Sequence, residues 1–398
     1  MAVDLTLPFL YLRARRARGS LIVNGEDILA ELNTEAVTDF GYSDNTSDKA
    51  DDLKVTITDP SRTWMQRKLP AEGIKCEAII NVENWTSPRD DRPFRCGTFW
   101  INHVHLKGPP NIVSIRASSV PPNGAKSTKK NKAWESSNLR DIAGQIAEVN
   151  ELVLFYDTQD NPLIKRVDQK DKTDLEFIRE RAKENKLSMK IHDGKLIIYS
   201  EEEYESREPI YVFDYGLSNY LEYSFESKTD DIYESATNSH VNTETGKITE
   251  TTFPDHNDPD DEANWSRISI PKSTKAKLRL NEDIEEEPDD PTMRNYAIPY
   301  ADDENLWNDS AAANKGKGKG RQKKGKQKAK AKLREKNKKE HQSSIKTVGN
   351  PIFLSGLNVE TLNFGIFDRK WFIESSNHEI SSSGYTTNLK LRGCLTGY

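Results

Sequence analysis

The 398-residue sequence contains no long hydrophobic run. Its best apolar stretches, residues 152–156 and 196–199, have the length of a strand, whereas a helix that spans a bilayer needs about 20 apolar residues. The sequence therefore predicts no membrane span. A secretory signal is not expected either, because the apolar residues 5–12 precede the arginines between positions 13 and 18 instead of following them. We therefore expect the newly synthesised protein to be in a cytoplasm.

Cysteine is scarce, and the three cysteines are Cys76, Cys96 and Cys394. Their odd number and wide spacing exclude a disulfide framework and do not match a zinc site. Because a free cysteine packs as a small hydrophobe, we expect buried thiols.

Apolar residues are also few, at 34%, whereas charged residues reach 31% and the mean hydropathy is -0.81. Globular chains have about 45–50% apolar residues when glycine is counted. Much of the chain is therefore expected to be solvated loop or tail. The length allows two or three domains.

Catalytic motifs are missing as well: the sequence has no G-x-S-x-G, no Walker A loop, no H-E-x-x-H and no glycine-rich loop after a strand. The acidic runs Glu201–Glu203 and Glu285–Glu287 contain enough carboxylates for a glycosidase pair, but runs of like charge are usually solvated faces. We predict that the chain is not an enzyme and has no catalytic residues.

Two patterns resemble metal sites. His103 and His105 alternate along an expected strand and share a face, but no third ligand is evident. The segment Asp255–Glu262 has carboxylates at alternate positions like a calcium loop, yet it lacks the glycine of the sharp turn and contains Pro259. We therefore predict a solvated acidic loop, no metal site and no cofactor.

Charge is strongly segregated. Residues 315–340 contain 14 Lys and Arg against 2 Glu, and residues 255–310 contain 16 Asp and Glu against 6 Lys and Arg. We expect a disordered basic segment and then a largely solvated helix over 327–339, where the composition favours helix. The basic segment is typical either of a nucleic-acid tail or of a solvated linker. The linker is favoured, because no aromatic residue for base stacking is interleaved with the lysines.

The first 120 residues are predicted to form a β-barrel or sandwich. Apolar residues alternate over 53–57, 76–82 and 113–117, and turn signals separate the runs. Residues 121–131 are typical of a linker.

The pattern then changes to an α+β module. Apolar residues at helical spacing follow Asn138 as the expected N-cap, and Thr173 with Glu176 forms a capping box before a second helix. Asp193-Gly194 separates two short apolar runs and predicts a type I′ hairpin.

A second β-region spans about 206–254 and 341–398, with the charged segment inserted in it. In its last strand Tyr385, Thr387, Leu389 and Leu391 are predicted to face the core. Lys390 and Arg392 share the other face with Thr386 and Asn388. They are candidates for a lumen or a subunit contact, and ordinary solvated charges are an equal alternative.

Several segments together resemble the phage late control D family, the tail baseplate hub proteins that are similar to the hub region of type VI spike proteins. They follow one another in the family's order, and they are residues 43–59, 138–152, 166–199, 228–233, 330–340 and 367–398. The resemblance covers nearly the whole chain and is weakest over 250–325. Residues 255–325 depart from the family pattern, because they are longer and more charged.

The resemblance implies an α+β fold that is mainly β, with two β-barrel-like hub domains. The expected boundaries are 1–120 for the first barrel, 121–205 for the α+β module, 206–254 with 341–398 for the second barrel, and 255–340 for the charged insertion. It also implies a homotrimer that joins a hexameric tail tube to a central spike in a virion or injection particle. The tail tube protein, the spike protein and the tape measure protein are the implied partners, and no specific nucleic-acid ligand is expected.

Two other functions stay open from the residues alone. A nucleic-acid-binding protein would use residues 315–340 and show a steep salt dependence that is lost on their deletion. A tail-tip cell-wall hydrolase would clear a peptidoglycan zymogram. A trimeric mass in solution would favour the hub.

Overall fold

The computed structural model describes most of the chain. The described residues are 14–30, 36–46, 49–64, 66, 70–85, 90–122, 128–228, 232–241, 248–254, 276–281 and 330–395. The acidic segments Asp255–Glu262 and Glu285–Glu287 and the lysine-rich residues 315–329 lie outside the described residues, so the expectations for them stay predictions.

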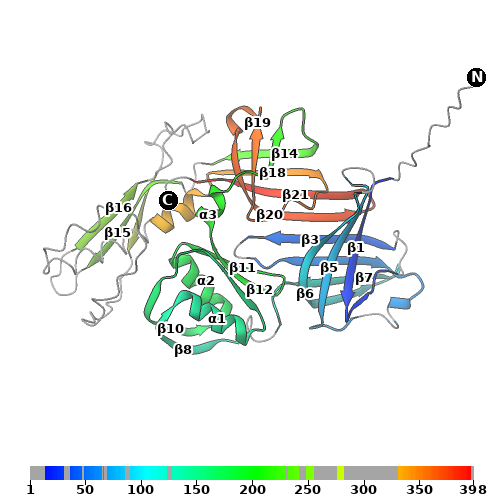
Figure 1. The fold of residues 1–398 in the computed structure, drawn as a ribbon, viewed down its shortest axis with the longest axis horizontal. Coiled ribbons are helices and arrows are strands. Elements are labelled where there is room, and N and C mark those ends of the chain that lie inside the picture. The colour runs from blue at the N-terminus through cyan, green and yellow to red at the C-terminus, as the bar shows by residue number, and fades with distance from the viewer. Residues whose placement is uncertain are drawn as a thin grey trace, which may run out of the picture.

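The first β-region is an antiparallel sheet that curves around one core (Figure 1). Its strands are β1 (Arg16–Val23), β2 (Glu26–Asp27), β3 (Val37–Asn45), β4 (Asp52–Thr58), β5 (Lys75–Glu83), β6 (Arg92–Lys107) and β7 (Ile112–Ser118). The predicted alternation is confirmed, because the apolar positions in 53–57, 76–82 and 113–117 are buried in one cluster.

The α+β module lies beside this region and has its own core. Its elements are β8 (Lys130–Asn138), α1 (Leu139–Val149), β9 (Val153–Asp157), β10 (Leu163–Lys172), α2 (Asp174–Glu184), β11 (Leu187–His192), β12 (Lys195–Ser200) and α3 (Glu201–Ser206). β8 pairs with β10, and β12 lies between β11 and the parallel strand β9. Strand β8 begins at Lys130, inside the predicted linker.

Two of the three local sequence signals in this module form the structures that they predict. Thr173 and Glu176 form the predicted capping box. Asp193 and Gly194 both have positive φ, 48° and 68°, as a type I′ turn demands. Asn138 is the N-cap residue of α1, but its side chain accepts no capping hydrogen bond.

The second β-region is built from segments far apart in sequence. Its elements are β13 (Tyr211–Asp214), β14 (Tyr220–Ser227), β18 (His341–Val348), β19 (Asn358–Leu362), the short helix η5 (Gly365–Phe367), β20 (Arg369–Ser381) and β21 (Gly384–Gly393). A separate sheet contains β15 (Tyr233–Val241), β16 (Ile248–Pro254) and β17 (Ala276–Asn281). Part of the predicted insertion, β17, thus pairs with β15.

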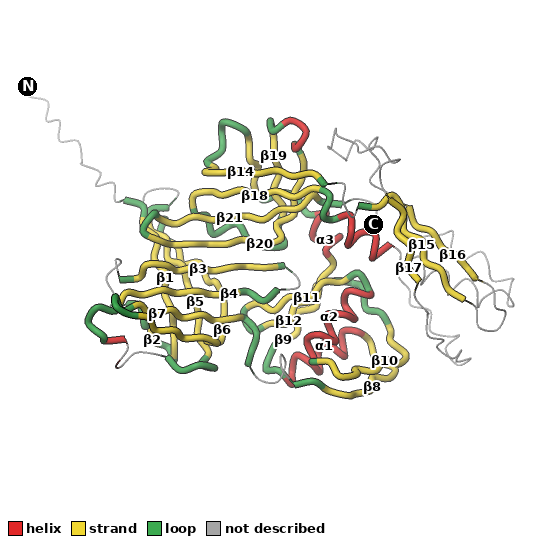
Figure 2. Tube along the Cα trace, turned by 180° about the vertical axis from the view of Figure 1, so that it is seen from behind, coloured by secondary structure: helices red, strands yellow, loops and turns green. Residues whose placement is uncertain are grey.

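One continuous sheet joins the two β-regions. β3 pairs with β20 along seven residues, from Asp39 opposite Ser381 to Asn45 opposite Ser375. The strand order is β14-β18-β21-β20-β3-β4-β7-β6-β5-β1-β2, and β19 and β13 continue from β20. Figure 2 shows the first part of this order, from β14 through β18, β21 and β20 to β3. The predicted class, an α+β fold that is mainly β, is confirmed.

The expectation of a solvated basic helix is wrong where the structure describes it. Residues 330–337 are helical, and Leu333 and Asn337 are fully buried while Arg334 is nearly so. The helix packs close to α3 and the end of β21, where Arg334 forms an ion pair with Glu205. Among the described residues, no helix is long and apolar enough to cross a membrane.

Candidate functional site

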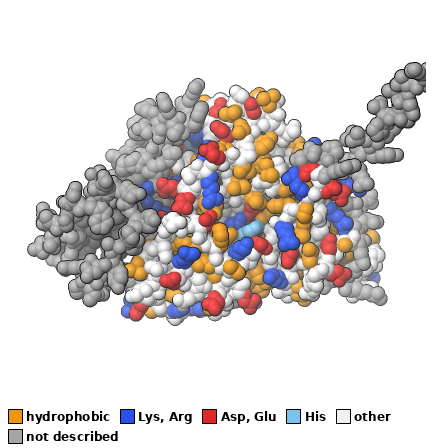
Figure 3. All heavy atoms as spheres, in the orientation of Figure 1, with side chains coloured by type: hydrophobic (Ala, Val, Ile, Leu, Met, Phe, Trp, Pro, Cys, Tyr) orange, Lys and Arg blue, Asp and Glu red, His pale blue; other side chains and the backbone are white. Residues whose placement is uncertain are grey.

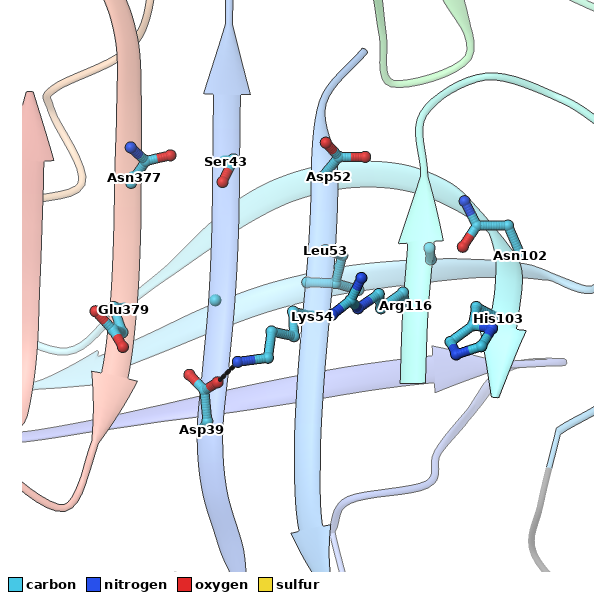
Figure 4. Close-up of a pocket in the computed structure, with 12 residues that line it drawn as sticks. Asp39, Ser43, Asp52, Leu53, Lys54, Asn102, His103, Arg116, Asn377 and Glu379 are labelled. Atoms are coloured by element: carbon cyan, nitrogen blue, oxygen red, sulfur yellow. Dashed lines mark hydrogen bonds and ion pairs between the residues drawn. The ribbon is translucent and has the colours of Figure 1, made fainter. Parts of the chain in front are cut away.

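Polar side chains form an open hollow on the outer face of the joined sheet (Figure 4). The hollow crosses five neighbouring strands, β20, β3, β4, β7 and β6, and has a volume of about 730 Å³. It is lined chiefly by Asp39, Ser43, Asp52, Lys54, Asn102, His103, Arg116, Asn377 and Glu379. Because most of these positions alternate with core residues on their strands, polar side chains predominate on the face opposite the core, and Leu53 and Ala117 add apolar atoms to the lining.

Strand register explains where the hollow lies. One row across the sheet runs from Glu379 through Gly41 and Lys54 to Arg116 and then His103. Gly41 has no side chain, and a Cβ there would meet only Asp39 at 4.0 Å. The row therefore has a gap in its middle, with charged side chains around it.

Among the described residues, the charges around this gap are only partly neutralised. Lys54 forms an ion pair with Asp39. Arg116 has no ion-pair partner among the described residues. His103 stacks on His105 with ring centroids 6.0 Å apart, so the two histidines do share a face. No acidic or sulfur ligand joins them in the described part of the chain, and the pair belongs to this outer face.

A second polar cluster is buried where three parts of the fold meet. Asp44 of β3 and Asp51, just before β4, approach Lys190 and His192 of β11. Lys190 Nζ contacts Asp44, and His192 Nδ1 lies 2.8 Å from an Asp51 carboxylate oxygen. Ser355 of the second β-region completes the cluster, because its backbone N–H donates to Asp44 at 2.7 Å. The cluster fastens the α+β module to both β-regions.

A lysine occupies the cation position of this cluster. Ligand atoms of Asp44, Asp51 and His192 lie within 4.8 Å of one another, close enough for a metal ion. The Lys190 ammonium, however, contacts Asp44 and lies 3.7 Å from Asp51. Burial would lower the pKa of Lys190, but the two carboxylates raise it above its ordinary value. The group is therefore a buried ion cluster that a metal would have to disrupt.

The sequence analysis did not single out these four residues. The sequence of β3 nevertheless contains a signal for a buried cluster, because Phe40, Tyr42 and Asp44 alternate on its core face. A carboxylate at a core position requires a buried partner, so this placement indicates an ion cluster. It does not identify the partner, which lies 146 positions away.

A third cluster corrects the prediction for Arg392. Arg392 lies 2.9 Å from Glu201 and 2.6 Å from Glu205, and its side chain is almost completely buried. The helix α3 and residues 330–337 cover this end of β21, so both faces of the strand are buried there. Arg392 is therefore not available for a lumen or a subunit contact. Lys390, two residues earlier, is exposed as predicted.

Glu201 is also buried, whereas an acidic run was expected to be solvated. Burial would raise the pKa of Glu201, but Arg392 and Lys338 lower it to about 2. Glu205 accepts a hydrogen bond from the Leu395 backbone N–H at 2.9 Å. Glu201 is therefore held as an anion in a structural cluster and does not resemble a general acid.

The cysteines mostly follow the prediction. Cys76 and Cys96 are buried, and Cys394 is partly exposed. Burial raises the pKa of the Cys76 thiol to about 12, so it stays protonated and packs as an apolar side chain.

Comparison with known proteins agrees with this arrangement. No family model matches the chain. The chain is 23% identical over 178 residues to a probable baseplate hub protein of Escherichia phage 186, and 24% identical over 179 residues to one of Escherichia phage P2. The aligned region spans 44% of this chain and 43% of each relative.

Solved structures match over almost the full length. A tail protein from Neisseria meningitidis MC58 superposes with a TM-score of 0.63 and 13% identity, covering 95% of this chain and 96% of that protein. The chain has the fold of phage tail proteins. The 43 kDa tail protein of prophage MuSo2 from Shewanella oneidensis gives the same TM-score of 0.63 with 10% identity, covering 94% of this chain and 98% of that protein.

The same fold is also found in a chain of a larger complex. A chain of the Francisella PdpA-VgrG complex matches with a TM-score of 0.51 and 10% identity, covering 97% of this chain and 59% of that chain. The similarity to baseplate hub proteins, indicated by the sequence segments, is confirmed.

Proposed function

We propose that this chain is a structural baseplate hub of a phage tail or of a phage-tail-like injection system. Three copies would form a symmetry adaptor between a hexameric tail tube and the central spike. The tail fold and the hub relatives support the role in general. The observation that carries the finer proposal is the continuous sheet, in which two β-regions pair side by side through β3 and β20.

The continuous sheet suits a symmetry adaptor. Three copies with two β-regions each present six β-regions, which is the number of subunits in one ring of a hexameric tube. The two regions must keep a fixed relation for such a ring to close. The β3 and β20 ladder and the buried cluster around Lys190 hold both regions and the α+β module together.

The charged residues also support a structural role. The ion clusters at Lys190 and Arg392 are buried, and each joins elements from different parts of the chain. A general acid or base needs access to a substrate and a pKa near the working pH. We therefore propose that the chain has no catalytic activity of its own.

The partners follow from this role. We propose contacts with the tail tube protein on one side and with the spike protein on the other, and the tape measure protein is a further candidate. The outer polar hollow offers Lys54, Arg116 and His103 for such contacts, since they face away from the core. The protein would then be located in the virion tail baseplate or in the injection particle, and the particle would be assembled in the cytoplasm of a bacterial host.

Light scattering coupled to size exclusion tests the oligomer. The proposal predicts a mass three times the 45.3 kDa of one chain. A monomer or a dimer at every protein concentration tested would contradict the trimeric adaptor.

Arg116→Glu reverses a charge that has no ion-pair partner among the described residues of the outer face, and it is expected to weaken binding of the tube or spike protein. Lys107→Glu, an exposed charge at the end of β6, is the matched control and should bind normally.

A further inference from the structure

Exposed apolar side chains gather at one end of the second β-region. Tyr215, Leu217, Leu221 and Tyr223 are 54%, 80%, 56% and 41% exposed, and Leu362 and Ile366 are exposed as well. We call these six residues the β14 patch. Figure 3 shows hydrophobic side chains concentrated in the upper part of the molecule, where Figure 1 places β14, β18 and β19. In the described part of the first β-region, by contrast, Leu106 is the only large apolar side chain that is exposed.

Contacts between neighbouring segments join the patch into one surface. The Phe364 ring contacts two of its members, with its centroid 5.5 Å from that of Tyr215 and 5.2 Å from that of Tyr223. The Tyr215 backbone N–H donates to the Leu362 carbonyl oxygen at 3.0 Å, so the segment before β14 lies beside the end of β19. A contiguous exposed apolar surface of this kind marks a site of protein or membrane contact.

The segments that form the patch carry charge of one sign. Residues 208–227 and 356–368 contain six acidic residues and no Lys or Arg. The acidic residues are Glu208, Asp214, Glu222, Glu226, Glu360 and Asp368. Of these six, only Glu226 forms an ion pair with a described residue, Lys228, at 3.1 Å. The patch is therefore an apolar surface in acidic surroundings.

We infer that the β14 patch binds another protein through a surface that is apolar and bears Lys or Arg residues at its edge. Burial of the exposed apolar side chains drives such an association, because it removes them from water. The basic residues of the partner meet acidic side chains that the described part of this chain leaves largely unpaired, which favours this partner over an acidic one. Aromatic side chains such as Tyr215 and Tyr223 are typical of the residues that contribute most to protein contacts. The inference goes beyond the proposed hub role and does not depend on it.

The same charges disfavour other occupants of the patch. In a two-fold contact between copies the patch would face itself, and the acidic residues of the two copies would be brought together. Nucleic-acid phosphates and the headgroups of anionic lipids would be repelled in the same way. A protein with basic residues around an apolar surface is attracted by both features of the patch.

Titration with synthetic peptides tests the inference on the full chain. The probe is an amphipathic helical peptide with Leu and Phe on one face and Lys on the other, and a second peptide has Glu in place of each Lys. Fluorescence anisotropy should show that the Lys peptide binds about tenfold or more tightly than the Glu peptide. Added salt should reduce this difference, because it screens exposed charges. Equal affinity of the two peptides would overturn the inference.

A double variant, Leu217→Asp with Leu221→Asp, places two charges in the patch. Both side chains are more than half exposed, so the variant should fold normally, and it should bind the Lys peptide about tenfold or more weakly than the wild type. Val153→Asp with Phe155→Asp is the matched control, because these side chains of β9 are 65% and 49% exposed and lie outside the patch. An equal loss of binding in the control would show that the peptide binds elsewhere, and the inference would then be wrong.

Light scattering separates this contact from a contact between copies of the chain. The variant with Leu217→Asp and Leu221→Asp should have the same mass in solution as the wild type, because no second copy covers the patch. A smaller mass of the variant would show that a second copy occupies it, which would contradict the inference. The mass of the wild type by itself tests the hub proposal and leaves this comparison unaffected.

Discussion

Charged residues in this protein are buried in clusters that connect distant segments. Arg392 is the clearest case, because it neutralises Glu201 and Glu205 of α3, almost two hundred positions away. Glu205 also accepts from Arg334 at 2.5 Å. Removing one member would leave the remaining buried charges only partly compensated in a medium that solvates them poorly.

We therefore expect Arg392→Met to destabilise the fold by about 3–5 kcal/mol. Denaturant unfolding of the wild-type chain and the variant measures this difference. Lys390→Ala is the control, since Lys390 is an exposed neighbour on the same strand, and it should change stability by less than about 0.5 kcal/mol. Similar losses in the two variants would contradict the buried cluster.

His378 gives the fold a dependence on pH. Its Nε2 lies 3.1 Å from the Phe353 carbonyl oxygen and its Nδ1 lies 2.8 Å from Tyr385 Oη. The neutral ring satisfies both contacts, with Nε2–H donating and Nδ1 accepting from the tyrosine hydroxyl. Burial lowers the pKa of His378 from 6.5 to about 4.

In the unfolded chain His378 binds a proton below about pH 6.5. In the folded chain the same side chain stays neutral until the pH falls to about 4. Stability is therefore lost as the pH falls through this window, by about 3 kcal/mol in total. Unfolding of wild type and His378→Gln at pH 7 and pH 4.5 isolates this contribution. The wild type should lose about 2–3 kcal/mol more than the variant, and a difference that does not change with pH would refute the assignment.

At the scale of elements, the starts of α1 and α2 in the α+β module provide a matched pair. Thr173 accepts from the Glu176 N–H at 3.3 Å, and the Glu176 carboxylate accepts from the Thr173 N–H at 2.9 Å. Asn138 occupies the same position before α1 without such a bond. Thr173→Ala should cost about 1 kcal/mol, and Asn138→Ala should cost clearly less. Thermal unfolding compares them, and a reversed order would mean that the cap is not what stabilises α2.

The sequence predicts these elements well where the signal is local. Apolar alternation identifies β4, β5 and β7, and the turn Asp193-Gly194 identifies the β11 and β12 hairpin, because each depends on neighbouring residues only. The pairing of β3 with β20 depends on partners more than 300 positions apart, and alternation does not encode the partner. The error at Arg392 has the same origin, since α3 and residues 330–337 cover a face that the strand pattern alone predicts to be free.

The whole molecule is organised around one continuous sheet. The two β-regions differ in position along the chain, yet the β3 and β20 ladder makes them neighbours in space, and the Lys190 cluster fixes the α+β module against both. A unit built in this way keeps the two β-regions and the α+β module in a fixed relation, as the proposed hub role requires. The relatives and the tail fold agree with such a role.

The most direct test of the hub proposal locates the chain in an assembled particle. Tail-like particles should be purified from the organism that encodes the chain, and antibody-labelled chain should be imaged by electron microscopy. The account predicts label at one end of each particle only, where the tube meets the spike. Label along the whole tube, or intact particles that do not contain the chain, would contradict it.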